Sequence, residues 1–346
     1  MDVGAHWVRA ALQVNPFGYE GRNAPKQFFD DEAHYNAKLL DTCDELGIRL
    51  IGITDHWRVD SAVGLIAAAE DRGIVALPGF EANSSEGIHI LVLFEAGTPL
   101  DDITAAIGRC GPNPGCPNGT TGESYANIMS RMAEAGALAI PAHANVRPTG
   151  LLTTRSGQPL AAMIKHPDLH AIGISPHVDA AKDQNAVVQG TGDFERVHPL
   201  AEIHADDVMG PRQLKKPGAS TWFKVSSASL ESLKLAVRTP ETRVSLSDPQ
   251  LTPRARIKNV SWVGGYLDRV PLPISSDLTA LIGGRGAGKS TVIESLRYAL
   301  DLQPISTQMG KDHRSIIDSV LRVGTIVRVE VESVSPTLES FTIQRE

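Results

Sequence analysis

The sequence predicts an α/β protein in which a distorted β/α barrel precedes a smaller phosphate-binding lobe. Between residues 35 and 245, helical stretches alternate with short apolar runs, which is typical of βαβ units. Residues 245–254 (SLSDPQLTPR) lack this periodicity and contain two prolines. A glycine-rich run follows at 283–290. We therefore expect a barrel over residues 1–245, a linker at 246–255 and a second domain at 256–346.

The barrel elements are predicted from the spacing of apolar residues. Helices are expected at 37–46, 62–71, 124–135 and 230–237, and strands at 49–54, 74–77, 88–94, 137–141 and 171–175. Residues 108–122 (GRCGPNPGCPNGTTG) are too rich in Gly, Pro and Asn for a regular element, so we expect a loop at the barrel mouth. Because so many short β/α units follow one another, we expect their strands to close into a barrel.

The second domain shows the order of a nucleotide-binding lobe. Strands are expected at 256–263 and at 277–282 (DLTALI), and a helix at 291–300 (TVIESLRYAL). Residues 325–333 and 340–345 alternate apolar and polar side chains, which predicts an antiparallel hairpin. The glycine-rich run lies between the expected strand and helix, as a phosphate-binding loop requires.

This run matches the pattern G-x-x-x-x-G-K-[ST]. The predicted nucleotide-binding residues are Gly283, Gly284, Arg285, Gly286, Ala287, Gly288, Lys289, Ser290 and Thr291. Glycines allow successive backbone N–H groups to turn toward phosphates, Lys289 neutralises the β and γ charge, and Ser290 offers a hydroxyl to Mg²⁺. Lys289 and Ser290 are therefore the candidate catalytic residues, and the expected cofactor is ATP with Mg²⁺.

The segment after the loop is short for a complete ATPase. Hydrolysis needs an acidic strand that holds the metal and activates water, and the chain continues only to Glu346. We expect a chain that stops inside its ATPase head, binds ATP weakly and turns it over slowly. A completed head is expected to be an ATPase.

Several expected strand ends in the barrel carry side chains that can bind a metal. The candidate ligands are His56, Glu81, His89, His143 and Asp206, the last followed by Asp207. Side chains at the carboxyl ends of barrel strands converge on one mouth, where cations activate water and stabilise phosphoryl charge. The alternative for His89 is a hydrogen-bonded core histidine, because a lone histidine on a strand more often has that role.

Composition sets broad limits on function. A net charge of −7 argues against a generally basic surface that coats nucleic acid, although a local basic groove remains compatible with it. Cys43, Cys110 and Cys116 form no even disulfide framework, so we expect free thiols in the cytoplasm. Residues 1–15 contain charged positions and no long apolar core, and we expect neither a signal peptide nor a membrane span.

The order of these motifs resembles the PHP (polymerase and histidinol phosphatase) family of metal-dependent phosphoesterases. The whole architecture is similar to TrlF-like proteins, in which a PHP domain precedes an ATPase head like those of SMC and Rad50 proteins. The likeness is carried by ITDHW at 53–57, PGFEAN at 78–83, IPAHAN at 140–145, ADD at 205–207 and STWFK at 220–224. It implies one Zn²⁺ or Mn²⁺ at His56, Glu81, His89, His143 and Asp206, and dimerisation with a second ATPase head.

The sequence departs from the PHP pattern at two motifs. The opening H-x-H aligns with Gln13 and Asn15, and the histidine of the closing D-x-H aligns with Val208. An amide oxygen is neutral and binds Zn²⁺ or Mn²⁺ less well than an imidazole. These departures weigh against full phosphoesterase activity and favour a reduced site.

Two hypotheses of function follow. In the first, an ATP-binding head controls a barrel that acts on or senses nucleic acid, DNA or RNA, by phosphodiester chemistry. In the second, the barrel has lost catalysis and the chain is a nucleotide-regulated binding module. Bound metal and metal-dependent cleavage distinguish the two hypotheses.

Overall fold

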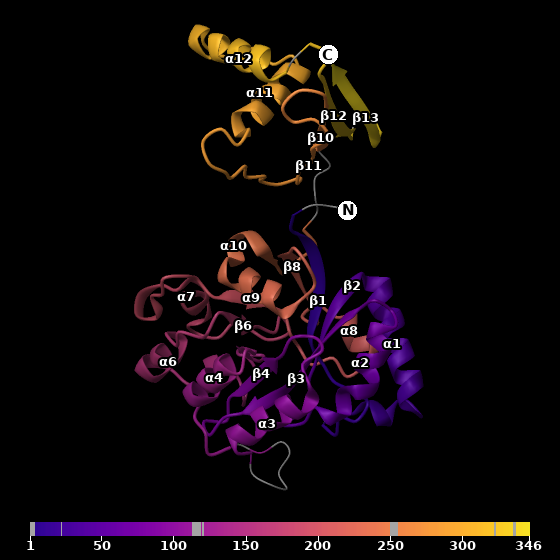
Figure 1. Ribbon diagram of the computed structural model, residues 1–346. Coiled ribbons are helices and arrows are strands. Elements are labelled where there is room, and N and C mark those ends of the chain that lie inside the picture. The colour runs from indigo at the N-terminus through magenta and orange to yellow at the C-terminus, as the bar shows by residue number, and fades with distance from the viewer. Residues whose placement is uncertain are drawn as a thin grey trace. The chain divides into compact units, whose positions relative to one another are not determined.

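The computed structural model describes residues 4–21, 23–112, 119, 121–249, 255–321, 323–334 and 337–346 (Figure 1). These residues form two compact units. The N-terminal unit runs from Ala5 to Pro249, and the C-terminal unit contains Gly4 and the residues from 255 to Glu346. Each unit has a hydrophobic core of its own.

The N-terminal unit is built on a curled seven-stranded sheet with the strand order β5-β4-β3-β2-β1-β8-β9. Its strands are β1 His6–Val14, β2 Ile48–Ile53, β3 Val75–Asn83, β4 His89–Leu93, β5 Leu138–Pro141, β8 Thr221–Val225 and β9 Val244–Ser245. The neighbours β1, β2 and β3 are parallel, and the other four pairings are antiparallel. The sheet is therefore mixed, which a strict β/α repeat does not give.

A second, two-stranded sheet continues the curve of the first. Its parallel strands are β6 Ala171–Gly173 and β7 Ala201–Ile203. Ala144 N donates to Gly173 O at 2.7 Å beside β5, and His204 N donates to Thr221 Oγ1 at 2.7 Å beside β8. A few hydrogen bonds, several of them from side chains, thus replace a continuous ladder at both joins. The predicted α/β class is confirmed, and the sheet is a half barrel completed by a separate pair of strands.

Helices cover the sheet of this unit. They are α1 Glu32–Leu46, α2 Val63–Glu70, α3 Leu100–Cys110, α4 Tyr125–Glu134, α5 Leu151–Thr154, α6 Gly157–Ile164, α7 Gln184–Gln189, α8 Pro211–Leu214, α9 Leu230–Arg238 and α10 Pro240–Arg243, with 3₁₀ turns at Pro25–Gln27, Asp60–Ala62 and Gly192–Phe194. The two ends of helix α1 illustrate how the sequence sets where a helix begins and ends. Asp31 caps it by accepting from His34 N, and Gly47 ends it in the left-handed region at φ 68°.

The core of the N-terminal unit follows the alternation of β1. Ala10 and Leu12 belong to a cluster that contains Leu50, whereas Ala11 and Val14 belong to a cluster with the buried residues of α1 and α2. Successive side chains of a strand point to opposite faces, so Ala10 and Leu12 face one core and Ala11 faces the other. Val14 joins the cluster of Ala11 because the strand register shifts between these two residues. This burial on both faces explains why the strand reads as a continuous apolar run.

The expectations for the 108–122 loop, the cysteines and a membrane span have different outcomes. Helix α3 reaches into 108–122, where a loop was expected, because Ile103, Ala106, Ile107 and Cys110 form a buried helical stripe. Residues 113–118 and 120 lie outside the described part, and so does Cys116. Cys43 and Cys110 are buried free thiols, as expected. No helix in the described part of the chain is long and apolar enough to cross a membrane.

The C-terminal unit contains a four-stranded antiparallel sheet and two helices. The strand order is β11-β10-β12-β13, and the elements are β10 Arg256–Val263, β11 Pro271–Pro273, α11 Lys289–Ala299, α12 Thr307–Val320, β12 Ile326–Ser333 and β13 Glu339–Arg345. The strand expected at 256–263 and the hairpin expected from the last alternating runs are confirmed. Val260, Trp262, Ala299, Val327 and Val329 form the buried core.

The strand expected at 277–282 is not formed. Leu278 and Ile282 are 89% and 94% exposed. Ser275 N donates to Thr279 Oγ1 at 3.0 Å, a local hydrogen bond in place of a ladder. An apolar β-prone run becomes a strand only where a neighbouring strand pairs its backbone, and no described strand does so here. The prediction was therefore wrong for this structure, and a parallel P-loop sheet is not present in the described residues.

Candidate metal centre

Three side chains that can bind a metal meet at one edge of the curled sheet. Glu81 lies near the end of β3, His89 begins β4, and His143 follows β5 by two residues. Antiparallel pairing of β3 with β4 and of β4 with β5 brings these positions to the same edge. One ligand atom of each residue lies within 4.8 Å of those of the other two. The structure thus brings together three of the five predicted ligands.

The Glu81 carboxylate lies among three imidazoles. Its Oε1 is 2.7 Å from His89 Nδ1 and 3.2 Å from His143 Nε2, and its Oε2 is 3.6 Å from His56 Nδ1. His56 is held there by the backbone, because Glu81 N donates to Asp55 O at 2.9 Å. His56 therefore lies beside the group of three.

The protonation states of Glu81 and of the histidines around it depend on one another. Glu81 is only 3% exposed, and burial alone would raise the pKa of its carboxyl. The charge of His89 and hydrogen bonds to His143 and His89 outweigh burial and hold that pKa well below its usual range. Burial would lower the pKa of His143, but its hydrogen bond to Glu81 and the Glu81 charge raise it to about 9. Without a metal, the cluster is a buried carboxylate held by protonated imidazole.

The backbone around the cluster is strained at two positions. His143 has a φ of 33° and Trp57, next to His56, has a φ of 52°. Non-glycine residues in this region cost about 1–3 kcal/mol each and are concentrated at functional sites. His143 Nδ1 is also buried without a hydrogen-bond partner among the described residues. The strain and the unpaired nitrogen both occur at residues that surround Glu81.

The two neighbouring aspartates have different surroundings. Asp206 accepts from Ser175 Oγ at 3.0 Å and lies 3.8 Å from His177 Nε2, and it does not belong to the group of three. Asp207 accepts from Gln13 Nε2 at 3.0 Å. Burial and the Glu81 charge raise the pKa of Asp207, while His143 and two other histidines oppose the rise. Asp207 thus shares the electrostatic environment of the Glu81 cluster.

The residues that replace the expected histidines differ in their surroundings. Gln13 and Asn15 are fully buried at the end of β1, and Gln13 Oε1 and Asn15 Nδ2 have no partner among the described residues. Val208 packs in the apolar cluster that contains Tyr35 and Leu214. The amides therefore bring unpaired polar atoms to the interior near Asp207, whereas Val208 brings none.

Sequence reasoning missed Tyr19, whose ring lies 5.8 Å from the His56 imidazole. Burial raises the pKa of the Tyr19 hydroxyl, and Asp207, Glu81 and Asp55 raise it further. The phenol therefore stays protonated and remains a hydrogen-bond donor at neutral pH. No local sequence signal marks Tyr19. Asp207 was adjacent to a predicted ligand, and only the fold could show which of the two aspartates faces the cluster.

The predicted phosphate-binding residues lie at the start of α11 in the C-terminal unit. Gly288 has a φ of 88° and directly precedes the helix, which begins at Lys289. Lys289 Nζ donates to Gly283 O and Gly284 O, each at 2.7 Å, and Ser290 is exposed. The Lys289 ammonium therefore bonds to carbonyls of its own loop. In general, the first N–H groups of a helix have no partner within the helix and favour an anion.

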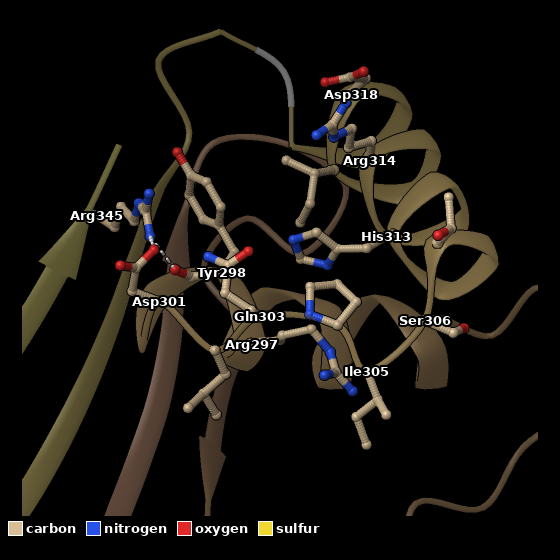
Figure 2. Close-up of a pocket in the computed structure, with 15 residues that line it drawn as sticks. Arg297, Tyr298, Asp301, Gln303, Ile305, Ser306, His313, Arg314, Asp318 and Arg345 are labelled. Carbon is tan, nitrogen blue, oxygen red and sulfur yellow. Dashed lines mark hydrogen bonds and ion pairs between the residues drawn. The ribbon is translucent and has the colours of Figure 1, made fainter.

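A cavity of about 650 Å³ lies at the other end of α11, between α11 and α12 (Figure 2). Its charged side chains are largely paired. Arg345 Nη1 is 2.9 Å from Asp301 Oδ1 and its guanidinium lies over the Tyr298 ring, while Arg297 Nε is 3.2 Å from Glu294 Oε2. This balance of charge gives no preference for an anionic or a cationic ligand.

Comparison with known proteins finds similar folds at low sequence identity. No family model matches the chain, and no curated protein does. A lesion-specific endonuclease from Pyrococcus furiosus is 14% identical over 74% of this chain and 62% of its own, with a TM-score of 0.49. A two-domain protein from Bacteroides vulgatus containing a predicted PHP-like metal-dependent phosphoesterase is 14% identical over 99% and 96% of the two chains, with a TM-score of 0.46. PsfC from Pseudomonas syringae is 12% identical over 69% and 90%, with a TM-score of 0.43. The chain thus spans less than two thirds of the length of the endonuclease.

Proposed function

We propose that the N-terminal unit is a metal-dependent phosphoesterase. The observation that carries this proposal is the convergence of Glu81, His89 and His143, whose ligand atoms lie within 4.8 Å of one another. In a tetrahedral zinc site with bonds of about 2.1 Å, neighbouring ligand atoms are about 3.4 Å apart. The 3.2 Å separation between Glu81 Oε1 and His143 Nε2 is close to that value, whereas the 2.7 Å separation from His89 Nδ1 is a hydrogen-bond distance that would lengthen when an ion binds.

The surrounding residues fit a divalent metal. Imidazole and carboxylate donors together suit Zn²⁺ and Mn²⁺. His56 and Asp207 extend the donor set, and the unpaired Gln13 Oε1 is a buried acceptor that a cation would satisfy. We assign Glu81, His89 and His143 as the residues that hold the ion, with His56 and Asp207 beside them. The bound ion would polarise a phosphoryl oxygen and make a nucleophilic water available at neutral pH.

The side chains near the ion supply proton transfer and orientation. Asp207 is held by Gln13 Nε2, and its raised pKa suits a group that takes a proton from water and returns it to a leaving oxygen. Tyr19 keeps its proton and donates a hydrogen bond to a phosphoryl oxygen. Burial of the cluster strengthens each of these interactions, because the local dielectric is low.

The test is hydrolysis of bis(p-nitrophenyl) phosphate, p-nitrophenyl phosphate and short DNA and RNA strands by the full chain with Zn²⁺, Mn²⁺ or Mg²⁺. We expect diester cleavage that His143→Ala reduces by about 10³-fold, because the variant loses one of the three assigned ligands. His34→Ala, an exposed histidine at the start of α1, is the control and should keep full activity. Absence of cleavage of every substrate would contradict the proposal, and absence of bound metal as well would support the nucleotide-regulated binding module.

We further propose that the C-terminal unit binds ATP with Mg²⁺ at the loop of residues 283–290. The supporting observation is that Lys289 and the exposed Ser290 lie at the N-terminus of α11. A nucleotide must displace the Lys289 side chain from two carbonyls, and the strand expected before the loop is not formed, so binding should be weak. This proposal also includes that the C-terminal unit is a lobe of an SMC-like ATPase head, that it pairs with a second head, and that the protein acts on or senses DNA or RNA.

Lys289→Ala is expected to weaken binding of a fluorescent ATP analogue at least about tenfold, since an ammonium–phosphate contact is lost. Fluorescence titration in Mg²⁺ buffer measures the effect. Lys311→Ala removes an equal charge from the exposed face of α12 and should leave the affinity unchanged. Equal binding by the wild-type chain and Lys289→Ala would rule out this site.

A further inference from the structure

A second cavity in the N-terminal unit, of about 570 Å³, lies away from the metal centre. Its walls come from the end of α6, the residues before β6 and β7, and the end of α9; Figure 1 labels α6, β6 and α9. His170 directly precedes β6, whereas Gly173, at the other end of β6, accepts the backbone hydrogen bond of Ala144 beside His143. The strand therefore runs for about 10 Å between the cavity and the metal centre.

The cavity is lined by more positive than negative groups. Lys165, Arg196 and Arg238 are cationic, and Glu195 is the carboxylate among the lining residues. The side chains of Lys165 and Arg238 make no hydrogen bond or ion pair with any residue in the described part of the chain. Unlike the cavity between α11 and α12, this one thus presents cations that are not neutralised by carboxylates.

Arg196 has a fixed place in the wall. Its guanidinium donates to the carbonyls of Ile164 and Leu169, and its Nε donates to His198 O at 3.4 Å. These bonds tie the end of α6 to the segment before β7. Because the acceptors are neutral carbonyls, the positive charge of Arg196 remains and contributes to the potential inside the cavity.

The pKa of His170, which lines the cavity, is affected by the neighbouring charges. Burial lowers the pKa of its imidazole, and the charges of Arg238 and Arg196 lower it further, with His198 in the same direction. Asp168 acts in the opposite direction but does not reverse the shift. Burial is the larger cause of the lowered pKa, and the contributions of Arg238 and Arg196 have the sign expected from the positive lining of the cavity.

Besides these charged groups and the histidines His166, His170 and His198, the wall has an apolar part. Pro167, Val197, Pro199 and Val237 line the cavity beside the cations, and Val197 is 91% exposed. A small inorganic anion would use only the charged part of this space. A ligand with a doubly charged head and a flat apolar body would use both parts.

We propose that this cavity binds an organic phosphate monoester, with its phosphate between Lys165 and Arg238 and its apolar body against Val237 and Pro199. Lysine and arginine are common phosphate ligands, and Arg196 fixes the wall that carries them. The site is separate from the Glu81 cluster and needs no metal. A test of ligand binding at this cavity therefore does not depend on phosphoesterase activity.

Isothermal titration of the full chain tests the proposal, with phenyl phosphate, adenosine 5′-monophosphate and inorganic phosphate as probes. A chelator keeps the metal centre empty, and the Lys289→Ala background removes the phosphate loop. We expect the two esters to bind more tightly than inorganic phosphate, and their affinity to fall as NaCl is raised. The double variant Lys165→Gln/Arg238→Gln should lose at least about tenfold in affinity for both esters.

The matched control is Lys26→Gln/Arg212→Gln, which removes the same charge from exposed positions elsewhere on this unit. It should bind like the parent chain. Unfolding temperatures of all variants show that each is folded. Absence of ester binding to the parent chain, or equal loss in the control pair, would overturn the proposal, as would a preference for inorganic phosphate.

Discussion

Replacing Glu81 by glutamine is expected to lower the affinity of the chain for Zn²⁺ or Mn²⁺ by at least about 100-fold. The carboxylate is the only anionic member of the group of three, and both assigned histidines contact its Oε1. The amide has nearly the same shape but no charge, so it binds a hard cation weakly. Metal content after dialysis and titration calorimetry measure the change.

The control for this variant is Glu202→Gln. Glu202 lies in β7, its carboxyl is half-buried, and burial raises its pKa, but no other side chain pairs with it in the described residues. It should retain the metal affinity of the parent chain. Unchanged metal binding in Glu81→Gln would show that the cluster is a buried ion-pair network and no metal centre.

The same titration should depend on pH. In the metal-free protein, the pKa of His143 is raised to about 9, so its imidazole carries a proton at neutral pH. A ligand nitrogen must lose that proton before it binds a metal. The apparent affinity should therefore rise by about tenfold for each unit between pH 7 and pH 8, with about one proton released per ion. Calorimetry in buffers of different ionisation enthalpy measures the released proton.

Replacing Trp262 by alanine is expected to destabilise the C-terminal unit by about 3–5 kcal/mol. Trp262 is the largest of the five buried residues in that core, and it lies opposite Val327 on the two central strands of the sheet, β10 and β12. A small core has few other contacts that compensate for such a cavity. The unfolding transition of this unit should fall in temperature, while that of the N-terminal unit should stay constant.

Trp262→Phe provides the matched comparison. Trp262 Nε1 is buried without a partner among the described residues, so phenylalanine removes an unsatisfied donor and keeps most of the apolar volume. We expect a loss well below that of the alanine variant. Calorimetry resolves the two units, and a simultaneous shift of both transitions would show that they unfold as one.

Local patterns predicted most of the individual elements. The run at 37–46 lies within α1, and the strand at 49–54 corresponds to β2, because apolar spacing in each matches the period of the element. The pairing of these elements was less predictable. β3 extends to Asn83 and turns back into β4, so its neighbours on the two sides are parallel and antiparallel. Such a choice depends on which backbones meet, and no local pattern encodes it.

The candidate site shows the same division. His56, Glu81, His89 and His143 were identified because each follows or begins an apolar run, where side chains of neighbouring strands meet. The choice between Asp206 and Asp207 could not be made in this way. Adjacent residues in extended chain point to opposite sides, and only the pairing of residues 13–15 with Val208 orients them.

The sequence alone determined the phosphate-loop pattern, the type of most elements and the residues able to bind a metal, because these depend on side-chain chemistry and short-range spacing. The tertiary structure decided the rest. It left residues 277–282 without a strand partner, brought Gln13 and Tyr19 near the Glu81 cluster, and gathered unpaired cations from α6 and α9 around one cavity. Each of these features requires residues far apart in the chain to meet, and that is fixed by long-range backbone pairing and packing.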